Sequence, residues 1–347
     1  MKDSYNQPFI TVFIGAYNRK DYLIKAVNSV LNQTIDKNLY EVIVSKNFID
    51  DKIDKYLEEN GCRIIFFERG LVGEQIASGV KEAKGKIIAF LDDDDLFLPN
   101  KLERIYDVFS KDDEIVYYHN EQLIATEDGK ILNKKYSVTT KKYPSDQFFN
   151  MDHTKLNNAI FNLSSIVIRK DYYLKYLNIL KNMPSHPDDF FFFAALNEKT
   201  HIFIDQLPLT IYLRYNNSLS YATIPSNNDT FSLKKYIENR SSIFSKYYKS
   251  SEKMYHAFTN PKLLKIIEFR LYREYIEYCY YSNVKLKKRN IKYYLKLIIR
   301  ILKIKDSLKY KFLVFVGSTF MFIFSFNQFK SLTLEKLITE AENIYIT

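Results

Sequence analysis

The sequence predicts an α/β fold, a mixed Rossmann-like sheet flanked by helices, with a C-terminal α-helical region. Short apolar segments rich in β-branched residues alternate with helix-like segments up to about residue 220. Four consecutive aspartates, Asp92–Asp95, directly follow one of these apolar segments. Beyond Ser220 the chain becomes rich in Lys, Tyr and Ile and poor in turn residues. We therefore expect an α/β domain at residues 1–224 and a helical region at residues 225–347.

The alternating segments can be assigned in order along the chain. Strands are expected at the short apolar runs, which are residues 9–14, 40–44, 63–67, 87–91, 114–118 and 164–168. Helices are expected where apolar residues recur at helical spacing, at residues 22–31, 54–59, 74–83, 101–109, 171–180 and 190–196. Strand–helix–strand units favour parallel pairing, so the carboxyl ends of the strands should meet at one edge of the sheet.

The composition is that of an ordinary globular protein. Hydrophobic residues make up 46% and charged residues 27% of the 347 residues, which argues against disorder. The two cysteines, Cys62 and Cys279, lie too far apart in sequence to form a disulfide framework or a metal-ligand spacing. Residues 1–8 lack the charged-then-apolar pattern of a secretory signal. We therefore expect a cytoplasmic protein.

The four aspartates are the clearest chemical signal. They lie between the apolar run 87–91 and Pro99, so several carboxylates should point past the sheet edge at one place. A divalent cation would relieve their mutual repulsion. Oxygen ligands of this kind suit Mg²⁺ or Mn²⁺, which would in turn hold a nucleotide diphosphate. The alternative is a solvated acidic loop in front of a helix that starts at Pro99.

Several motifs, in this order along the chain, resemble the family 2 glycosyltransferases, which have the GT-A fold. The resemblance covers about residues 8–220. Its motifs are Ile14–Arg19, like the opening nucleotide-binding loop; Ser29–Thr34, like the end of the next helix; Gly79–Gly85 and Phe90–Asp95 with Pro99, like the approach to the metal site; Asp188–Asp189, like the acidic pair that supplies the catalytic base; and Arg214 with Ser218–Ser220, like the loop that closes over the donor.

This resemblance implies an inverting, metal-dependent glycosyltransferase. Its donor would be a nucleotide sugar, a UDP- or GDP-sugar, and its acceptor a hydroxyl of a glycan, a lipid-linked molecule or a protein. Asp94 and Asp92 would hold Mg²⁺ or Mn²⁺, and Asp189, beside Asp188, would act as the general base. The implied nucleotide-sugar-binding residues are Gly15, Tyr17, Asn18, Arg19, Asn47, Asp92, Asp93 and Arg214. A helix N-cap is the alternative for the acidic pair, and an ordinary core position is the alternative for Tyr17.

The chain departs from the family pattern at three places. Relatives usually carry Asp-Asp after the second strand, where the first carboxylate accepts the uracil N3–H, but this chain has Ser45–Asn47. Asn47 offers only an amide oxygen as the acceptor. The Arg-Asn pair expected in the third helix is Ile76–Ala77, and the histidine of the closing loop is absent, with Asn216 nearest. The identities of the sugar and the nucleotide therefore stay open.

The positive charge of the chain is concentrated in one segment. Residues 285–311 hold eleven Lys and Arg against one acid, Asp306, so this segment alone equals the net charge of +10 of the chain. One face of the predicted helix carries Ile291, Leu295, Ile298 and Leu302 beside a basic stripe. The uncharged segment 312–326 is shorter than the ~20 residues of a membrane span. We expect residues 285–326 to contact the anionic inner face of the cell membrane. A core helix and a homodimer contact are alternatives, and no recognisable motif supports nucleic acid.

Two other functions fit parts of this pattern. A nucleotidyltransferase also joins an α/β nucleotide fold to an aspartate-held metal, but Gly15–Tyr17 is not a Gly-rich loop that bears Arg or Lys for phosphates. A catalytically silent sugar-nucleotide-binding homologue would keep the fold and lose donor chemistry through Lys46 and Ile76–Ala77. The intact Asp92–Asp95 and Asp189 favour an enzyme.

Overall fold

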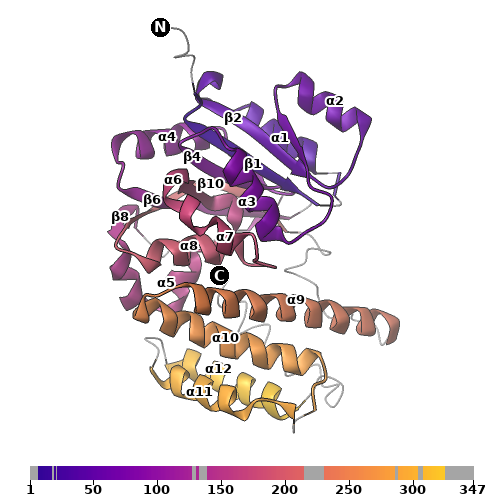
Figure 1. Cartoon of the computed structure of the whole chain (residues 1–347), viewed down its shortest axis with the longest axis vertical. Coiled ribbons are helices and arrows are strands. Elements are labelled where there is room, and N and C mark those ends of the chain that lie inside the picture. The colour runs from indigo at the N-terminus through magenta and orange to yellow at the C-terminus, as the bar shows by residue number, and fades with distance from the viewer. Residues whose placement is uncertain are drawn as a thin grey trace. The chain divides into compact units, whose positions relative to one another are not determined.

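The chain divides into two compact units, shown in Figure 1 as a computed structural model that describes residues 7–17, 19–20, 22–126, 130–132, 139–214, 230–285, 288–303 and 308–324. The α/β unit comprises Met1–Phe148, Ala159–Met183 and Pro187–Tyr215. The helical unit comprises Phe149–Asn158, Pro184–His186 and Asn216–Thr347. The predicted boundary near residue 225 lies outside the described residues.

The α/β unit is built on one mixed sheet of ten strands. Its strand order is β3-β2-β1-β4-β9-β6-β10-β5, with β7 paired to β6 and β8 paired to β10. The strands are β1 (Ile10–Ala16), β2 (Tyr40–Lys46), β3 (Arg63–Phe66), β4 (Ile87–Asp92), β5 (Leu96–Phe97), β6 (Ile115–Thr126), β7 (Ile131–Leu132), β8 (Lys141–Pro144), β9 (Ile166–Arg169) and β10 (His201–Arg214). The mixed sheet flanked by helices confirms the predicted fold class.

Helices connect the strands of this unit. They are α1 (Leu23–Leu31), α2 (Asp51–Glu59), α3 (Val72–Glu82), α4 (Lys101–Lys111), α6 (Lys170–Tyr173), α7 (Leu177–Leu180) and α8 (Pro187–Asn197), with 3₁₀ turns η1 (Lys37–Leu39), η2 (Ser145–Asn150), η3 (Leu163–Ser165) and η4 (Leu174–Tyr176). Helix α2 begins where its sequence supplies a cap, because the carboxylate of Asp50 accepts hydrogen bonds from the N–H groups of Lys52 and Ile53. Strands β3, β2, β1 and β4 pair in parallel, whereas β9 lies antiparallel between β4 and β6.

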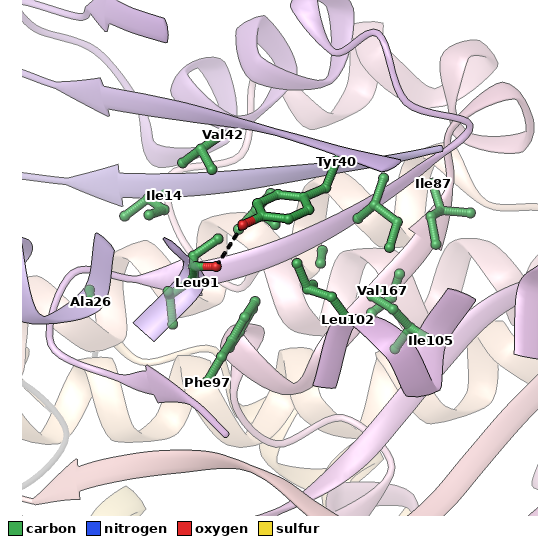
Figure 2. Packing of buried hydrophobic residues seen from close by; sticks show 14 of the residues in the cluster. Ile14, Ala26, Tyr40, Val42, Ile87, Leu91, Phe97, Leu102, Ile105 and Val167 are labelled. Atoms are coloured by element: carbon green, nitrogen blue, oxygen red, sulfur yellow. Dashed lines mark hydrogen bonds between the residues drawn. The ribbon is translucent and has the colours of Figure 1, made fainter. Parts of the chain in front are cut away.

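One face of the sheet packs against α1 and α4. Figure 2 shows Ile14 of β1 and Leu91 of β4 beside Phe97, Leu102 and Ile105. All five side chains are buried, at 3% exposure or less. Successive residues of a strand point to opposite faces of the sheet. Every second residue of β1 and β4 therefore packs against these helices.

The other face packs against α3 and α8. Phe90 of β4 stacks on Phe191 of α8 with ring centroids 4.8 Å apart. Helix α3 lies so close to β1 that a Cβ built on Gly79 would come within 2.0 Å of the Phe13 ring. Asp92 is two residues beyond Phe90 in β4, so its side chain belongs to this second face.

The helical unit contains α5 (His153–Asn158), α9 (Thr230–Ala257), α10 (Pro261–Tyr281), α11 (Ile291–Lys303) and α12 (Leu308–Ile323). Helix α10 begins at a cap formed by Asn260 and at Pro261, and it packs against α9, α11 and α12. Buried Glu268 pairs with Arg300 and accepts a hydrogen bond from the Tyr272 hydroxyl. None of the described helices combines the length and the apolar character needed to cross a bilayer.

Helix α11 has apolar side chains on two faces. Leu297 and Ile301 are buried against α10 and α12 and form part of the core of the helical unit. Ile291, Leu295 and Leu302, which were predicted to share one face, are exposed. Ile298 was predicted on the same face, but it packs partly buried against the core, and Ile299 is exposed instead, at 51%.

The largest differences from the sequence prediction lie in the second half of the α/β unit. Strand β10, fourteen residues long, was not predicted. Strand β6 extends to Thr126 rather than ending near residue 118. The single helix expected at residues 171–180 is broken into α6, η4 and α7.

Candidate functional site

The carboxyl ends of three parallel strands meet at one edge of the α/β unit. Gly15 of β1 lies between Ser45 of β2 and Asp92 of β4 in the pairing register. Asp93–Asp95 continue past the end of β4, and polar loops continue past β1 and β2. Ligands of open α/β sheets bind at this kind of edge. The candidate site therefore lies at the edge that the sequence predicted.

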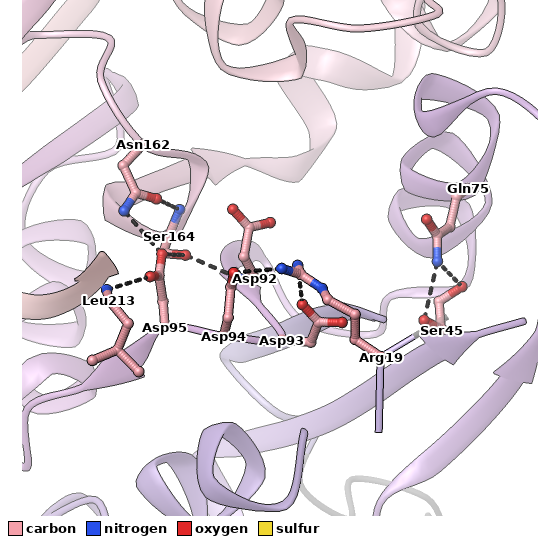
Figure 3. A network of polar contacts seen from close by, with 10 residues as sticks. All are labelled: Arg19, Ser45, Gln75, Asp92, Asp93, Asp94, Asp95, Asn162, Ser164 and Leu213. Atoms are coloured by element: carbon pink, nitrogen blue, oxygen red, sulfur yellow. Dashed lines mark hydrogen bonds and ion pairs between the residues drawn. The ribbon is translucent and has the colours of Figure 1, made fainter. Parts of the chain in front are cut away.

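Arg19, in the loop after β1, faces the aspartates (Figure 3). Its Nη2 pairs with Oδ1 of Asp93, and its Nη1 lies 2.5 Å from Oδ2 of Asp94. The side chain of Asp93 is fully buried and that of Asp94 is 15% exposed, whereas that of Arg19 is 41% exposed. Three predicted site residues are thus in direct contact, with the guanidinium on the solvent side.

Asp95 has different partners from the other three aspartates. Its Oδ2 accepts hydrogen bonds from Nδ2 of Asn162 at 2.9 Å and from Oγ of Ser164 at 2.6 Å, and its Oδ1 accepts one from the Leu213 N–H at 3.1 Å. It is 1% exposed. A carboxylate that is surrounded by donors in this way anchors neighbouring segments to one another and has little capacity left for a ligand.

Crowding and burial disfavour full ionisation of the cluster. Burial raises the pKa of Asp92 well above its usual range, and the carboxylates of Asp95, Asp94 and Asp93 raise it further. Burial raises the pKa of Asp93 to about 6, although Arg19 opposes the shift. Burial, together with Asp94, raises the pKa of Asp95 to about 7. Carboxyl groups in this state are stabilised in their ionised form by an added cation.

The donor set at this position fits a divalent metal ion. Carboxylate oxygens are the hard ligands that Mg²⁺ and Mn²⁺ prefer. Oδ2 of Asp93 is buried and has no hydrogen-bond partner within the part of the chain that the structure describes. Asp92 and Asp94 are partly accessible, so both can reach a bound ion.

The end of β2 carries a buried cation where an acid was expected from the family pattern. Nζ of Lys46 lies 2.7 Å from a carboxylate oxygen of Asp54 and donates to the carbonyl of Phe48 at 2.5 Å. The neighbouring Ser45 receives hydrogen bonds from Nε2 of Gln75 at its carbonyl (3.0 Å) and its hydroxyl (3.2 Å). Lys46 and Ser45, at the end of β2, are therefore both engaged by other parts of the chain. Asn47 is the next residue.

The acidic pair Asp188–Asp189 lies in the first turn of α8, where the helix dipole stabilises negative charge. The N–H of Asp189 donates to Oδ1 of Asp188 at 3.0 Å, and Asp189 is 3% exposed. Phe191 of the same helix stacks on Phe90, two residues before Asp92. The acidic pair and Asp92 therefore lie on the same face of the sheet. The alternative considered for this pair was a helix N-cap, but α8 begins at Pro187, so both aspartates lie inside its first turn. This position is compatible with a role as a base.

A possible acidic metal-binding group also occurs at this helix start. His186, Asp188 and Asp189 each offer one ligand atom, and these atoms lie within 4.8 Å of one another.

The structure also places two further predicted residues, Arg214 and Tyr17. Arg214 is the last residue of β10 rather than part of a loop, and it adjoins Leu213, whose N–H binds Asp95. Tyr17 is 50% exposed, which excludes the core position considered for it. Asn18 and the closing-loop segment Ser218–Ser220 lie outside the described residues.

Sequence reasoning missed two kinds of site residue. Asn162, at a positive φ of 74°, and Ser164 orient Asp95 although they lie about seventy residues away in sequence. Four consecutive polar residues, His119–Gln122, are buried in the middle of β6. They are connected to the site through Asn120, which donates to the Thr210 hydroxyl, and that hydroxyl donates to the carbonyl of Ser164. The signal for the second group was present, because a polar run inside an otherwise apolar strand has to be hydrogen-bonded.

Comparison with known proteins gives a consistent result. Residues 11–177 match the sequence profile described as Glycosyl transferase family 2. An uncharacterized glycosyltransferase of Rickettsia typhi is 29% identical over 185 residues, which cover 51% of this chain and 58% of the relative. An uncharacterized glycosyltransferase of Nostoc sp. is 36% identical over 127 residues, covering 35% of this chain and 39% of the relative. The chain thus matches 58% of the length of the first relative and 39% of the length of the second.

A solved structure shares the fold over most of the chain. The crystal structure of S. aureus TarS 1-349 in complex with UDP-GlcNAc aligns with a TM-score of 0.55 and 12% identity, covering 90% of this chain and 88% of that one. At this identity the likeness concerns the fold.

Proposed function

Because the chain belongs to the family 2 glycosyltransferases, we propose that it transfers a sugar, with inversion, from a nucleotide-sugar donor to a hydroxyl group of a glycan, a lipid-linked molecule or a protein. The observation that carries this proposal is the cluster of Asp92–Asp94 with Arg19 at the carboxyl edge of the parallel strands. The bound UDP-GlcNAc of TarS supports a nucleotide sugar, and a UDP-sugar in particular, as the donor.

Asp94 and Asp92 are the proposed ligands of Mg²⁺ or Mn²⁺. When bound, the ion would neutralise charge that develops on the leaving nucleoside diphosphate. Asp93 is buried beneath Arg19 and keeps that guanidinium at the edge of the site. The nucleotide would be held by Gly15, near the end of β1, and by the segments that follow β1 and β2, which supply Tyr17, Asn18, Arg19 and Asn47. Arg214 would approach the donor from the end of β10.

Asp189 is the proposed general base. It would take the proton from the acceptor hydroxyl as that oxygen attacks the anomeric carbon from the side opposite the leaving group. Its position on the face that carries Asp92 supports this role, and the adjacent Asp188 is the competing candidate.

The chemistry at the end of β2 argues for a base contact different from that of most relatives. The Lys46 ammonium, which pairs with Asp54, can only donate a hydrogen bond and so cannot accept the N3–H of uracil. Asn47, the next residue, carries an amide oxygen of the kind that can accept it. Its amide also carries a donor, which is compatible with more than one base.

The site of action proposed for this enzyme is an anionic membrane surface. Helix α11 exposes Ile291, Leu295, Ile299 and Leu302, and α12 exposes Leu308 and Phe312. Exposed apolar side chains beside basic ones are typical of peripheral membrane contact. A peripheral position at the inner face of the cell membrane follows from this proposal.

Incubation with a panel of UDP- and GDP-sugars, with and without Mn²⁺, tests the proposed function. Release of nucleoside diphosphate that depends on Asp189 is the expected result. Release of pyrophosphate would instead establish a nucleotidyltransferase. Binding of a sugar nucleotide without release of either product, across the panel and with acceptor extracts, would establish a catalytically silent binding protein.

A further inference from the structure

Arg19 is in contact with a carboxylate that is proposed to hold the metal ion. The proposed metal ligand Asp94 is in contact with the Arg19 guanidinium at 2.5 Å, and the same guanidinium holds the fully buried Asp93. A buried carboxylate requires a counter-charge, because an unpaired charge in the protein interior is costly. Without metal, this counter-charge comes from the chain itself.

The guanidinium is also able to leave. Its side chain is 41% exposed, so it lies on the solvent side of both carboxylates. Its planar fork of donors matches two oxygens of a diphosphate as well as it matches two carboxylates. The adjacent Lys20 is tied instead to Asp50, at the N-terminus of α2, by a 2.9 Å ion pair, so the two basic residues of this loop have different partners.

We propose that Arg19 is an exchangeable counter-ion that couples metal binding to nucleotide binding. It neutralises Asp93 and Asp94 in the metal-free protein and moves to the diphosphate when the metal–nucleotide complex binds. Metal alone must displace it, and therefore binds weakly. Metal with nucleotide offers it a new partner, so each ligand strengthens the binding of the other. This inference rests on the proposed function, in which Asp94 holds the metal.

Mn²⁺ binding, followed by the electron paramagnetic resonance signal of the free ion, tests the coupling without any measurement of activity. The full-length protein is titrated with Mn²⁺ alone and with Mn²⁺ in the presence of UDP or GDP. In the unmodified protein, Mn²⁺ should bind at least tenfold more tightly with the nucleotide. Arg19→Gln should bind Mn²⁺ alone about tenfold more tightly, because the ion no longer competes with the ion pair of Arg19 and Asp94. It should bind the nucleotide in saturating Mn²⁺ about tenfold more weakly, because the ion pair of Arg19 with the diphosphate is lost.

Lys20→Gln is the matched control, because it removes one positive charge from the same loop, where Lys20 pairs with Asp50 and not with Asp93 or Asp94. It should behave as the unmodified protein. Arg19→Lys, which keeps the charge, serves as the second variant if Arg19→Gln does not fold, and it should retain weak binding of Mn²⁺ alone and lose nucleotide affinity.

The possible failures can be told apart. If Mn²⁺ and nucleotide bind the unmodified protein together but Arg19→Gln leaves both affinities unchanged, or weakens Mn²⁺ binding, Arg19 is a fixed structural ion pair and the inference is wrong. If neither protein binds Mn²⁺ with either nucleotide, the metal-dependent function proposed above is wrong as well.

Discussion

At the scale of the residue, four identical side chains in consecutive positions have four different environments. Asp92 ends a strand, Asp93 is buried beneath Arg19, Asp94 is the partly exposed partner of the same guanidinium, and Asp95 is enclosed by donors from Asn162, Ser164 and Leu213. Chemical type alone therefore does not assign a role within this run. Burial and hydrogen-bond partners favour Asp92 and Asp94 as ligands and Asp95 as a structural anchor.

Asp94→Asn should remove metal-dependent binding of the donor nucleotide. The substitution takes one anionic oxygen from the metal site, and the diphosphate is held mainly through the ion. Calorimetry with UDP and GDP, with and without Mn²⁺, should show at least a tenfold loss of affinity in the presence of metal. Asp113→Asn, at a 97% exposed position that pairs with Arg169, is the control. Unchanged metal-dependent affinity in Asp94→Asn would show that the metal lies elsewhere, for example at the group of His186, Asp188 and Asp189.

Asp189→Asn should leave donor affinity unchanged and lower turnover by ~10²–10⁴-fold, because a general base acts in the transition state and not in ground-state binding. Steady-state kinetics and calorimetry on the same protein separate the two effects. Asp188→Asn should retain most of the activity. The reverse pattern, an active Asp189→Asn and an inactive Asp188→Asn, would exchange the roles of the two residues.

At the scale of the element, the agreement between sequence and structure follows the continuity of the apolar pattern. Strands β1, β2 and β4 consist mainly of apolar residues that are buried on both faces, so their positions were predicted within two residues. Strand β10 contains Asp205, Gln206 and Pro208, and its pairing with β6 is irregular at Pro208. Polar residues and a proline are typical of a loop, so tertiary pairing with β6, β8 and β5 decides the structure there.

In the candidate site too, local features were predicted and long-range contacts were not. The four aspartates and the acidic pair of α8 are each consecutive in sequence, so the residue types and their spacing were enough to predict them as site residues. The contacts that orient them join residues about 70 to 120 positions apart, as in the hydrogen bonds of Ser164 and Leu213 with Asp95. No local periodicity reports such contacts. Arg19 illustrates the limit, since its type was predicted but its pairing with Asp93 and Asp94 was not.

Two glycines of neighbouring elements should respond differently to alanine. A Cβ on Gly85, before β4, would lie 2.4 Å from the backbone nitrogen of Thr11, which cannot move without disturbing β1. On Gly15 it would meet Phe13 and Gln75 only at 3.7 and 4.0 Å. Gly85→Ala should lower the free energy of unfolding by about 1–3 kcal/mol, and Gly15→Ala should change it by less than ~0.5 kcal/mol. Urea denaturation measures both. Equal effects would contradict the close packing of Gly85 against the backbone of Thr11.

At the scale of the whole molecule, charge and exposed apolar surface coincide in sequence. The segment 285–311 carries a net charge equal to that of the chain, and its helix α11 exposes apolar side chains at four positions. Part of the basic charge is used internally, because Arg300 and Lys296 lie beside the buried Glu268. Lys292 and Lys303 are exposed and remain available to an anionic surface.

Helix α11 should bind anionic membranes through two separable contributions, from its exposed apolar side chains and from its exposed lysines. Leu295 and Ile299 are 54% and 51% exposed, so replacing both with Gln should abolish binding to phosphatidylglycerol-containing liposomes while the fold is kept. Replacing Lys292 and Lys303 with Gln should weaken binding about thirtyfold, at ~1 kcal/mol per basic residue, and reduce its dependence on salt. Ile49→Gln, at a 71% exposed position of the α/β unit, is the control. Liposome co-sedimentation measures binding, and circular dichroism checks the fold. The membrane proposal is wrong if the unmodified protein does not bind anionic liposomes. If sedimentation velocity then shows a dimer, and the substitutions at Leu295 and Ile299 dissociate it, this surface is a contact between two copies of the chain.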